Sequence, residues 1–219
     1  AYPHAALKQE DVYDVYQGLL PISAMDPTTG DIRFTKAYQI KNHSESNEVE
    51  GLVSVAGVKY TTARDVAEKT TNLVLEKLKQ PAIACRTAEI PLVGGQIEHF
   101  EDFLSEAIEK KPNELSTETI THLVYHYGAN YLKILDDIEA QPELGQQICA
   151  DPLVLKAEIA HAIREEMALN LSDVVFHRTV LGSNGVPQET CLQACAYFMA
   201  DELGWDETRI QQQINTAKN

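Results

Sequence analysis

The stretch from Gly51 to Leu78 reads GLVSVAGVKYTTARDVAEKTTNLVLEKL, and its pattern organises the rest of the chain. Leu52 to Val55 is a short, mostly apolar run that predicts a strand. After a turn at Gly57, apolar residues recur at three- and four-residue steps from Val66 to Leu78, which is the period of one buried helical face. The stretch therefore predicts a strand that turns into a helix over residues 62–79.

The turn between this strand and this helix is a candidate ligand site. Thr61 or Thr62 can cap the helix, because either hydroxyl can accept a hydrogen bond from a free amide of the first turn. The free amides and the helix dipole favour an electron-rich ligand atom. Lys59 adds a positive charge beside them, and Gly57 permits close approach of the backbone. A plain strand–turn–helix with an exposed lysine is the alternative, and the residues alone leave both open.

The composition limits the classes of partner. The chain has 219 residues, enough for one or two domains, with 44% hydrophobic and 23% charged residues. Its net charge of −15 argues against broad nucleic-acid binding, which needs a basic face, and against electrostatic adhesion to an anionic membrane. No run approaches the roughly 20 apolar residues of a membrane-spanning helix. A local basic pocket for an anionic substrate remains compatible with this charge.

The four cysteines predict free thiols. Cys85, Cys149, Cys191 and Cys195 include no CxxC pair, and the last two lie one helical turn apart, which suits core packing better than a disulfide. We therefore expect reduced cysteines in a cytosolic setting.

The first fifty residues and the segment after residue 79 are of mixed character. MDPTTGD at 25–31 predicts a turn rather than a calcium loop, because the remaining ligand positions and the closing glutamate are absent. Residues 32–40 predict an imperfect strand, and residues 41–50 predict an exposed connection to the next strand. Residues 85–95 (CRTAEIPLVGG) predict an irregular arm that packs along another surface.

From about Glu98 the pattern is almost wholly helical. Helices are expected from Phe100, over 117–126, 129–138 and 142–149, from Pro152 onward, over 171–178, and over 188–203 and 206–216. We predict an α+β fold dominated by helices. In it, residues 1–95 carry the strands and the helix 62–79, residues 96–111 form a connecting helix or arm, and residues 112–219 form an all-helical C-terminal domain.

Polar residues of the helical part predict structural roles. His122 and His126 have a metal-compatible spacing, but no third ligand is evident, so ordinary helix histidines are expected. His161 and His177 are expected to pack or form hydrogen bonds. The charged residues of this region are interpreted as interhelical ion pairs rather than as a site; they are Glu158, Arg164, Glu166, Asp173 and Arg178. No GxSxG elbow, Walker loop or GxGxxG loop occurs anywhere in the chain.

SVAGVKYTTARDVAEKTTNLVLEKL resembles the GGK-x-TT-x-R-x-x-A-E segment of the FAD-dependent glycerol-3-phosphate dehydrogenases. The similarity continues in the same order through TAEIPLVGG, HLVYHYGANYLKIL and AEIAHAIREEMALNLSDVVFHRT, and it ends at CAYFMADELGWDETRIQQQI. It covers nearly the whole chain from about residue 11. The resemblance implies the C-terminal portion of such an enzyme, with residues 1–95 a partial segment of the flavoprotein's substrate and FAD domain. In the family, the GxGxxG loop belongs to an N-terminal FAD domain.

The resemblance also implies roles for single residues. Lys59 matches a catalytic lysine close to the flavin and the substrate. The cofactor-binding set is Gly57, Lys59, Thr61 and Thr62. Lys36, in FTKAY, falls where the family usually has an arginine that helps to hold the substrate phosphate. GLLP at 18–21 falls on the family's G-x-R-P, so Leu20 replaces another phosphate-binding arginine.

The activity implied by the resemblance belongs to the parent protein. That protein would oxidise glycerol 3-phosphate to dihydroxyacetone phosphate by hydride transfer to FAD. Without the N-terminal FAD domain, this chain alone is expected to bind FAD weakly or not at all, and to be inactive. The expected partners are the anionic substrate and that FAD domain; a homo-oligomer and peripheral contact with a membrane from the cytoplasm are compatible with the resemblance. Two alternatives stay open: a non-catalytic helical assembly or regulatory module, and a divergent flavoenzyme with another substrate.

Overall fold

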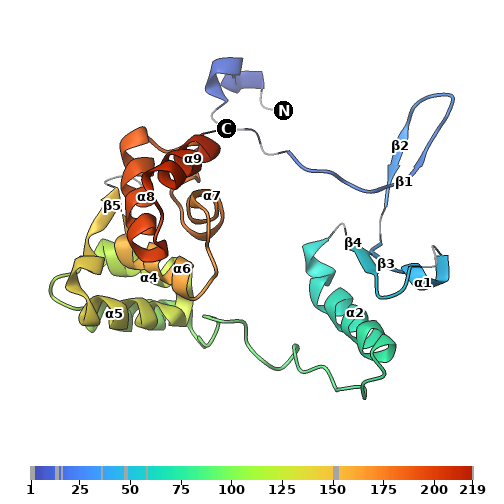
Figure 1. Ribbon diagram of the computed structural model, residues 1–219, viewed down its shortest axis with the longest axis horizontal. Coiled ribbons are helices and arrows are strands. Elements are labelled where there is room, and N and C mark those ends of the chain that lie inside the picture. Colours follow the sequence, from blue (N-terminus) through green and yellow to red (C-terminus); the bar gives the residue numbers. More distant parts are fainter. Residues whose placement is uncertain are drawn as a thin grey trace. The chain divides into compact units, whose positions relative to one another are not determined.

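The computed structural model describes residues 3–12, 15, 17–35, 37–46, 49–57, 59–149 and 153–218 (Figure 1). The chain divides into two compact units. The first, the helical unit, comprises Ala1–Val15 and Leu92–Asn219, and the second, the strand unit, comprises Tyr16–Pro91. Each unit is described by itself.

The strand unit begins with a hairpin of β1 (Ile22–Met25) and β2 (Ile32–Phe34), which pair antiparallel. The predicted turn between them is confirmed. The Asp26 carboxylate accepts hydrogen bonds from the backbone amides of Thr28 and Thr29 at 2.8 and 3.1 Å, as in an Asx turn. These two bonds stabilise the ionised carboxylate and lower the pKa of Asp26.

A second hairpin leads into the long helix of the strand unit. β3 (Gln39–Asn42) pairs antiparallel with β4 (Val53–Ala56), with the helical turn α1 (His43–Ser46) in their connection. The 3₁₀ turn η3 (Tyr60–Thr62) and α2 (Ala63–Lys77) follow β4 (Figure 1). The strand–turn–helix predicted from the sequence is confirmed, with a helix slightly shorter than residues 62–79.

Polar side chains rather than a core hold α2 to the β3–β4 hairpin. Tyr38, just before β3, donates its hydroxyl hydrogen to Asp65 Oδ2 at 2.9 Å. Lys69 Nζ donates to the Tyr38 hydroxyl oxygen at 2.6 Å and to Asp65 Oδ2 at 3.0 Å. About two turns further along α2, Lys77 Nζ donates to Asn42 Oδ1 at 2.8 Å. None of the described residues between 17 and 91 is buried, so these bonds carry much of the packing.

The helical unit is built from α-helices that enclose two adjacent apolar clusters. Its main helices are α3 (Phe100–Glu109), α4 (Thr117–Tyr127), α5 (Tyr131–Ala140), α6 (Lys156–Arg164), α7 (Leu171–Asp173), α8 (Glu189–Leu203) and α9 (Glu207–Ala217). Short 3₁₀ turns η1 (Pro3–Ala5) and η2 (Gln9–Asp11) lie near the N-terminus, η4 (Gly128–Asn130) lies between α4 and α5, and the π-helical turn η6 (Val174–Arg178) follows α7. The helix-dominated α+β class is confirmed.

Helix α6 is the centre of the helical unit, because it supplies residues to both clusters. Ala157 and Ala160 pack with α3, α4 and α5, whereas Ile159 and Ala162 pack with α8 and α9. All four side chains are buried. A helix that is apolar on opposite faces is expected where two layers meet on it.

The helix predicted over residues 142–149 is wrong in its second half. A 3₁₀ turn, η5 (Pro142–Gly145), is followed by β5 (Gln147–Cys149), which pairs antiparallel with β6 (Val154–Leu155). Leu144 and Ile148 have a helical spacing, but pairing with β6 keeps the second of them in an extended segment. The predicted helix start at Pro152 lies outside the described residues, and α6 begins at Lys156.

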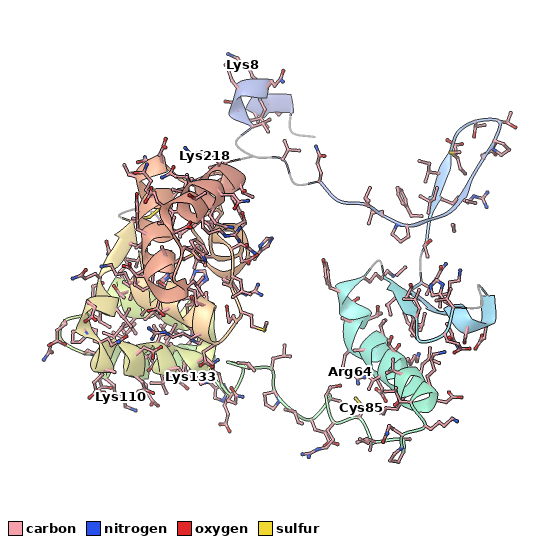
Figure 2. All side chains as sticks on the ribbon, viewed as in Figure 1. Lys8, Arg64, Cys85, Lys110, Lys133 and Lys218 are labelled. Atoms are coloured by element: carbon pink, nitrogen blue, oxygen red, sulfur yellow. A yellow bond between two sulfur atoms is a disulfide. The ribbon has the colours of Figure 1, made fainter. Side chains whose placement is uncertain are left out.

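The prediction that all cysteines are reduced is wrong for one pair. Cys149 in β5 forms a disulfide with Cys191 in α8, with a Cα–Cα distance of 5.5 Å. The two are 42 residues apart in the chain, and only the packing of β5 against α8 brings them together. Cys195 is buried as a free thiol, and burial raises its pKa to about 12. Cys85 is a free, exposed thiol (Figure 2).

Within the described part of the chain, no helix combines the length and the apolar character needed to cross a bilayer.

Candidate functional site

The strand unit contains a groove of about 810 Å³ at the predicted ligand turn. It is lined by residues that precede β1, by the end of β4 and by the first turns of α2, among them Leu19, Leu20, Val55, Gly57, Lys59 and Tyr60. Two of the predicted site residues, Gly57 and Lys59, therefore lie on one groove. Thr61 and Thr62 lie next to them in η3, whereas Lys36 lies outside the described residues.

Lys59 is exposed at this groove and is available to a ligand. Among the residues that the structure describes, nothing forms a hydrogen bond or an ion pair with its ammonium group. Its backbone carbonyl accepts the hydroxyl hydrogen of Thr62 at 3.1 Å. Leu20, which stands in place of an arginine, is 62% exposed on the same groove and brings no charge to it.

The expectation that Thr61 or Thr62 caps α2 is wrong. Thr62 occupies the N-cap position with φ −104° and ψ 5°, and its side chain accepts no hydrogen bond from the helix. An N-cap side chain reaches the first-turn amides from an extended backbone, whereas the 3₁₀ turn before α2 directs the Thr62 hydroxyl back to Lys59. The N-terminus of this 15-residue helix thus has no side-chain cap. Its first amides bond to the preceding 3₁₀ turn instead, because Thr62 N–H donates to the Lys59 carbonyl oxygen at 3.4 Å and Ala63 N–H donates to the Tyr60 carbonyl oxygen.

Apolar groups complete the groove. Tyr60 is 99% exposed, and Leu19 and Val55 are exposed beside it. A β-carbon placed on Gly57 would meet no atom within 4 Å, so the backbone there is open to close approach. An exposed cation, a helix terminus without a side-chain cap and exposed apolar side chains together suit a planar, electron-rich group.

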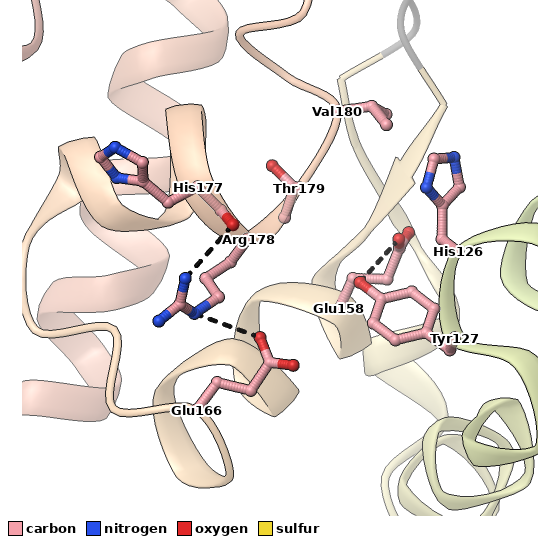
Figure 3. Close-up of a pocket in the computed structure, with 8 residues that line it drawn as sticks. All are labelled: His126, Tyr127, Glu158, Glu166, His177, Arg178, Thr179 and Val180. Atoms are coloured by element: carbon pink, nitrogen blue, oxygen red, sulfur yellow. Dashed lines mark hydrogen bonds and ion pairs between the residues drawn. The ribbon is translucent and has the colours of Figure 1, made fainter. Parts of the chain in front are cut away.

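A second cavity, of about 460 Å³, lies inside the helical unit (Figure 3). It is lined by His126 and Tyr127 at the end of α4, Glu158 of α6, Glu166, His177 and Arg178 at the end of η6, and Thr179 and Val180. We call it the Glu158 cavity. The charged residues of this region were expected to form ion pairs, and one such pair does link Arg164 of α6 to Glu202 of α8, at 2.6 and 3.0 Å.

Glu158 itself is not paired with an arginine or a lysine in the described chain. It is 1% exposed, and two hydrogen-bond donors and one histidine ring nitrogen lie around its carboxylate. His122 Nε2 lies 2.9 Å from Oε1, the Tyr127 hydroxyl donates to Oε1 at 3.1 Å, and the Leu155 amide donates to Oε2 at 2.7 Å. Burial and then the charge of Glu158 raise the pKa of Tyr127, so its hydroxyl stays protonated and donates.

The opposite wall of the cavity carries Arg178. Its Nε lies 3.5 Å from Glu166 Oε2, and its Nη1 donates to the His177 carbonyl oxygen at 3.3 Å. In Figure 3 the guanidinium faces Glu166, while Glu158 and Tyr127 lie on the other side of Thr179. Burial and the neighbouring His122 lower the pKa of His126, which favours its neutral ring.

Sequence reasoning did not single out this cavity. The available signal was the position of Glu158 inside the run Ala157–Ala162, where the remaining residues apart from His161 are alanine and isoleucine. No group of three or more His, Cys, Asp or Glu side chains in the described chain is placed to hold a metal ion.

Comparison with known proteins places the helical unit in a family. Residues 85–210 match the family described as the C-terminal domain of alpha-glycerophosphate oxidase. Because the match spans more than half of the chain, the chain belongs to this family.

Named relatives extend the similarity to the strand unit. The chain is 32% identical over 216 residues to the glycerol-3-phosphate dehydrogenase of Synechocystis, a match that covers 97% of this chain and 38% of the relative. It is 26% identical to the human mitochondrial glycerol-3-phosphate dehydrogenase, covering 97% of this chain and 29% of the relative. The similarity to the C-terminal portion of such dehydrogenases, expected from the sequence, is confirmed. The chain spans about a third of the length of these relatives.

A solved structure shares the fold. The glycerol-3-phosphate dehydrogenase of Bacillus halodurans, complexed with FAD, superposes with a TM-score of 0.60 at 26% identity. The superposition covers 76% of this chain and 34% of that chain.

Proposed function

We propose that this chain is the C-terminal part of an FAD-dependent glycerol-3-phosphate dehydrogenase, which oxidises glycerol 3-phosphate to dihydroxyacetone phosphate. The observation that carries the proposal is the uncapped N-terminus of α2 with the exposed Lys59 beside it. It lies in a segment that aligns with relatives of that name.

The residues of the groove fit one side of a flavin ring. Gly57 leaves room for close approach, the exposed Tyr60 and Val55 offer an apolar face, and the positive end of the α2 dipole suits an electron-rich ring edge. When bound, FAD supplies the acceptor for the hydride that leaves the substrate's carbinol carbon. Lys59 would stabilise the negative charge that the flavin ring takes up with the hydride, and Thr61 and Thr62 would offer hydroxyl groups beside the ring.

The side chains that would bind the substrate phosphate are only partly present in this chain. Leu20 provides neither charge nor hydrogen bonds where the family has an arginine. We assign the phosphate to Lys36, which keeps the positive charge but not the bidentate geometry of a guanidinium. The remaining contacts would come from the FAD domain.

The proposed domain organisation is that of the C-terminal part of such an enzyme. Residues 1–95 would complete the FAD and substrate domain, and residues 112–219 would form the helical C-terminal domain. Residues 96–111 would connect these two parts. The exposed apolar side chains of the strand unit support a covering partner domain, because no described residue from 17 to 91 is buried. We propose a cytoplasmic enzyme with at most peripheral membrane contact, able to form a homo-oligomer.

Flavin reduction tests the proposal. The full-length gene product, or this chain co-expressed with its FAD domain, should carry flavin whose absorbance bleaches anaerobically on addition of glycerol 3-phosphate. Lys59→Ala should slow the bleaching by a factor of about 10² to 10³, the range for loss of one charge-stabilising group. Lys133→Ala, which removes an exposed lysine of α5, is the matched control and should react at the normal rate (Figure 2).

Two outcomes would contradict the proposal. If a correctly loaded flavin is not bleached, the dehydrogenase assignment is wrong, and a helical assembly module or another substrate is favoured. If the 219-residue chain alone purifies with about one equivalent of flavin, the dependence on a separate FAD domain is wrong.

A further inference from the structure

We propose that the Glu158 cavity is a second binding site, for a small oxyanion that also carries a hydroxyl group. The anionic end would bind Arg178, and the hydroxyl would donate to the Glu158–Tyr127 wall. The site lies wholly within the helical unit and uses none of the residues assigned to the flavin. It therefore stands or falls independently of the proposed dehydrogenase activity.

The Glu158 wall offers acceptors. Glu158 Oε1 already faces two partners, His122 and Tyr127, whereas Oε2 accepts one hydrogen bond, from the Leu155 amide. A carboxylate oxygen has two acceptor positions, so Oε2 retains one. The Tyr127 hydroxyl uses its hydrogen on Glu158, which leaves its oxygen to accept. A ligand must bring its own hydrogen-bond donor to this wall.

The Arg178 wall offers donors. The guanidinium has five N–H groups, and the described chain uses only its Nε, with Glu166 at 3.5 Å, and its Nη1, with the His177 carbonyl at 3.3 Å. In the described residues, Nη2 forms no hydrogen bond. The Thr179 hydroxyl hydrogen is not available to a ligand anion, because it is donated to the Val174 carbonyl oxygen at 2.8 Å. A planar guanidinium with free N–H groups is suited to a carboxylate or a phosphate.

Both walls together select the class of ligand. An anion without a donor would leave the Glu158 wall unmatched and face the Glu158 charge, and a simple cation would face Arg178. A hydroxylated oxyanion satisfies both walls at once. The cavity of about 460 Å³ lies within the range of small-molecule sites, which makes it large enough for a compact hydroxycarboxylate or polyol phosphate.

Histidine side chains provide a local probe of this site. His126 lines the cavity, whereas His4, His43 and His99 lie elsewhere in the chain and serve as internal controls. The full-length gene product, labelled in its histidine rings, is titrated with glycerate, inorganic phosphate or glycerol while the ring resonances are followed. We expect glycerate to shift the His126 resonances saturably in the millimolar range, phosphate to bind more weakly, and glycerol to produce no saturable shift.

Variants assign the binding to Arg178. Arg178→Ala should weaken glycerate binding at His126 by at least about tenfold, because a charge-assisted contact is lost. Arg64→Ala, which removes an exposed arginine of α2, should bind as the wild type does (Figure 2). Lys59→Ala should also leave the His126 titration unchanged, which separates this site from the flavin groove. Arg178 is half-exposed, so its replacement is expected to fold.

Three results would overturn the proposal. They are the absence of a saturable His126 shift with glycerate, unchanged glycerate affinity in Arg178→Ala, and phosphate binding as tightly as glycerate. Phosphate binding as tight as glycerate binding would show that the Glu158 wall does not favour a hydroxylated ligand.

Discussion

Gly94 and Gly128 pack backbone against backbone in the helical unit. This close approach leaves neither position room for a β-carbon. The Gly94 carbonyl accepts a hydrogen bond from the Ala129 amide at 2.9 Å, and a β-carbon on Gly94 would lie 2.5 Å from the Tyr127 carbonyl oxygen. Both glycines also have positive φ angles, of 81° and 54°. This contact fastens the end of the irregular arm to the end of α4, so the predicted packing of the arm on another surface is confirmed there.

Replacing Gly128 should therefore loosen the helical unit. Gly128→Ala adds a steric conflict with Gly94 to the cost of a positive φ angle, and that strain alone costs about 1–3 kcal/mol. The free energy of unfolding should be measured by urea denaturation followed by fluorescence of Trp205, the single tryptophan, which packs on the core of this unit.

Gly204→Ala is the matched control for this substitution. Gly204 has a φ of 69°, but a β-carbon there would meet no atom within 4 Å. Gly204 has the left-handed helical conformation (φ 69°, ψ 38°), whereas Gly128 has ψ −135°, so alanine at Gly204 should cost only a backbone strain of about 1–2 kcal/mol. Equal destabilisation by the two variants would contradict the importance of the Gly94–Gly128 contact.

Reduction of the Cys149–Cys191 disulfide should destabilise the helical unit. The bond closes a loop with a sequence separation of 42 between β5 and α8, and such a link typically contributes about 2–4 kcal/mol. Cys149→Ser should lower the free energy of unfolding by a similar amount, whereas Cys85→Ser, at an exposed free thiol, should have little effect. Peptide mapping without reductant checks the pairing directly. Four alkylated thiols in the untreated protein would refute it.

Local features of this fold were predictable because their causes are local. The strand–turn–helix around Gly57 and the Asp26 turn depend on residues close together in the chain, and so do most of the helices. The grouping of Gly57 with Lys59, Thr61 and Thr62 was predictable for the same reason. The failed Thr62 cap shows the limit of such reasoning, because a 3₁₀ turn of three residues reversed the direction of one hydroxyl.

The features that escaped prediction depend on distant parts of the chain. Cys149 meets Cys191 only through packing of β5 on α8, and Leu20 joins Lys59 at the groove only through the tertiary structure of the strand unit. Glu158 was interpreted as an ion-pair partner because its acceptor role requires His122 from another helix. No periodicity or spacing in one sequence contains these pairings.

Glu158 should be less replaceable than its charged neighbours. Glu158→Gln places an amide NH₂ among the three donor contacts of a fully buried carboxylate, which leaves at least one buried donor unpaired. The expected loss in the free energy of unfolding is about 1–3 kcal/mol. Glu166→Gln, at the half-exposed ion pair with Arg178, should cost only about 0–1 kcal/mol. Urea denaturation of both variants makes the comparison, and equal losses would show that burial of Glu158 does not matter to stability.

His126 should make the stability of the helical unit depend on pH in the weakly acidic range. Burial and the neighbouring His122 lower its pKa in the folded protein below the unfolded value of about 6.5. The unfolded chain therefore takes up a proton first as the pH falls. The stabilising effect of the neutral ring is complete above about pH 6.5 and is lost as the pH drops through that value toward the folded pKa.

His126→Asn should flatten this dependence. Between about pH 7.5 and 5.5, where most carboxylates stay ionised, the free energy of unfolding of the wild type should fall more steeply than that of the variant. His99→Asn, which removes an exposed histidine outside the Glu158 cavity, is the control and should keep the wild-type slope. Urea denaturation at several pH values, followed by Trp205 fluorescence, measures both slopes. If His126→Asn and the wild type have the same slope, the partial desolvation of the His126 ring and its neighbour His122 do not control the pH dependence of the helical unit.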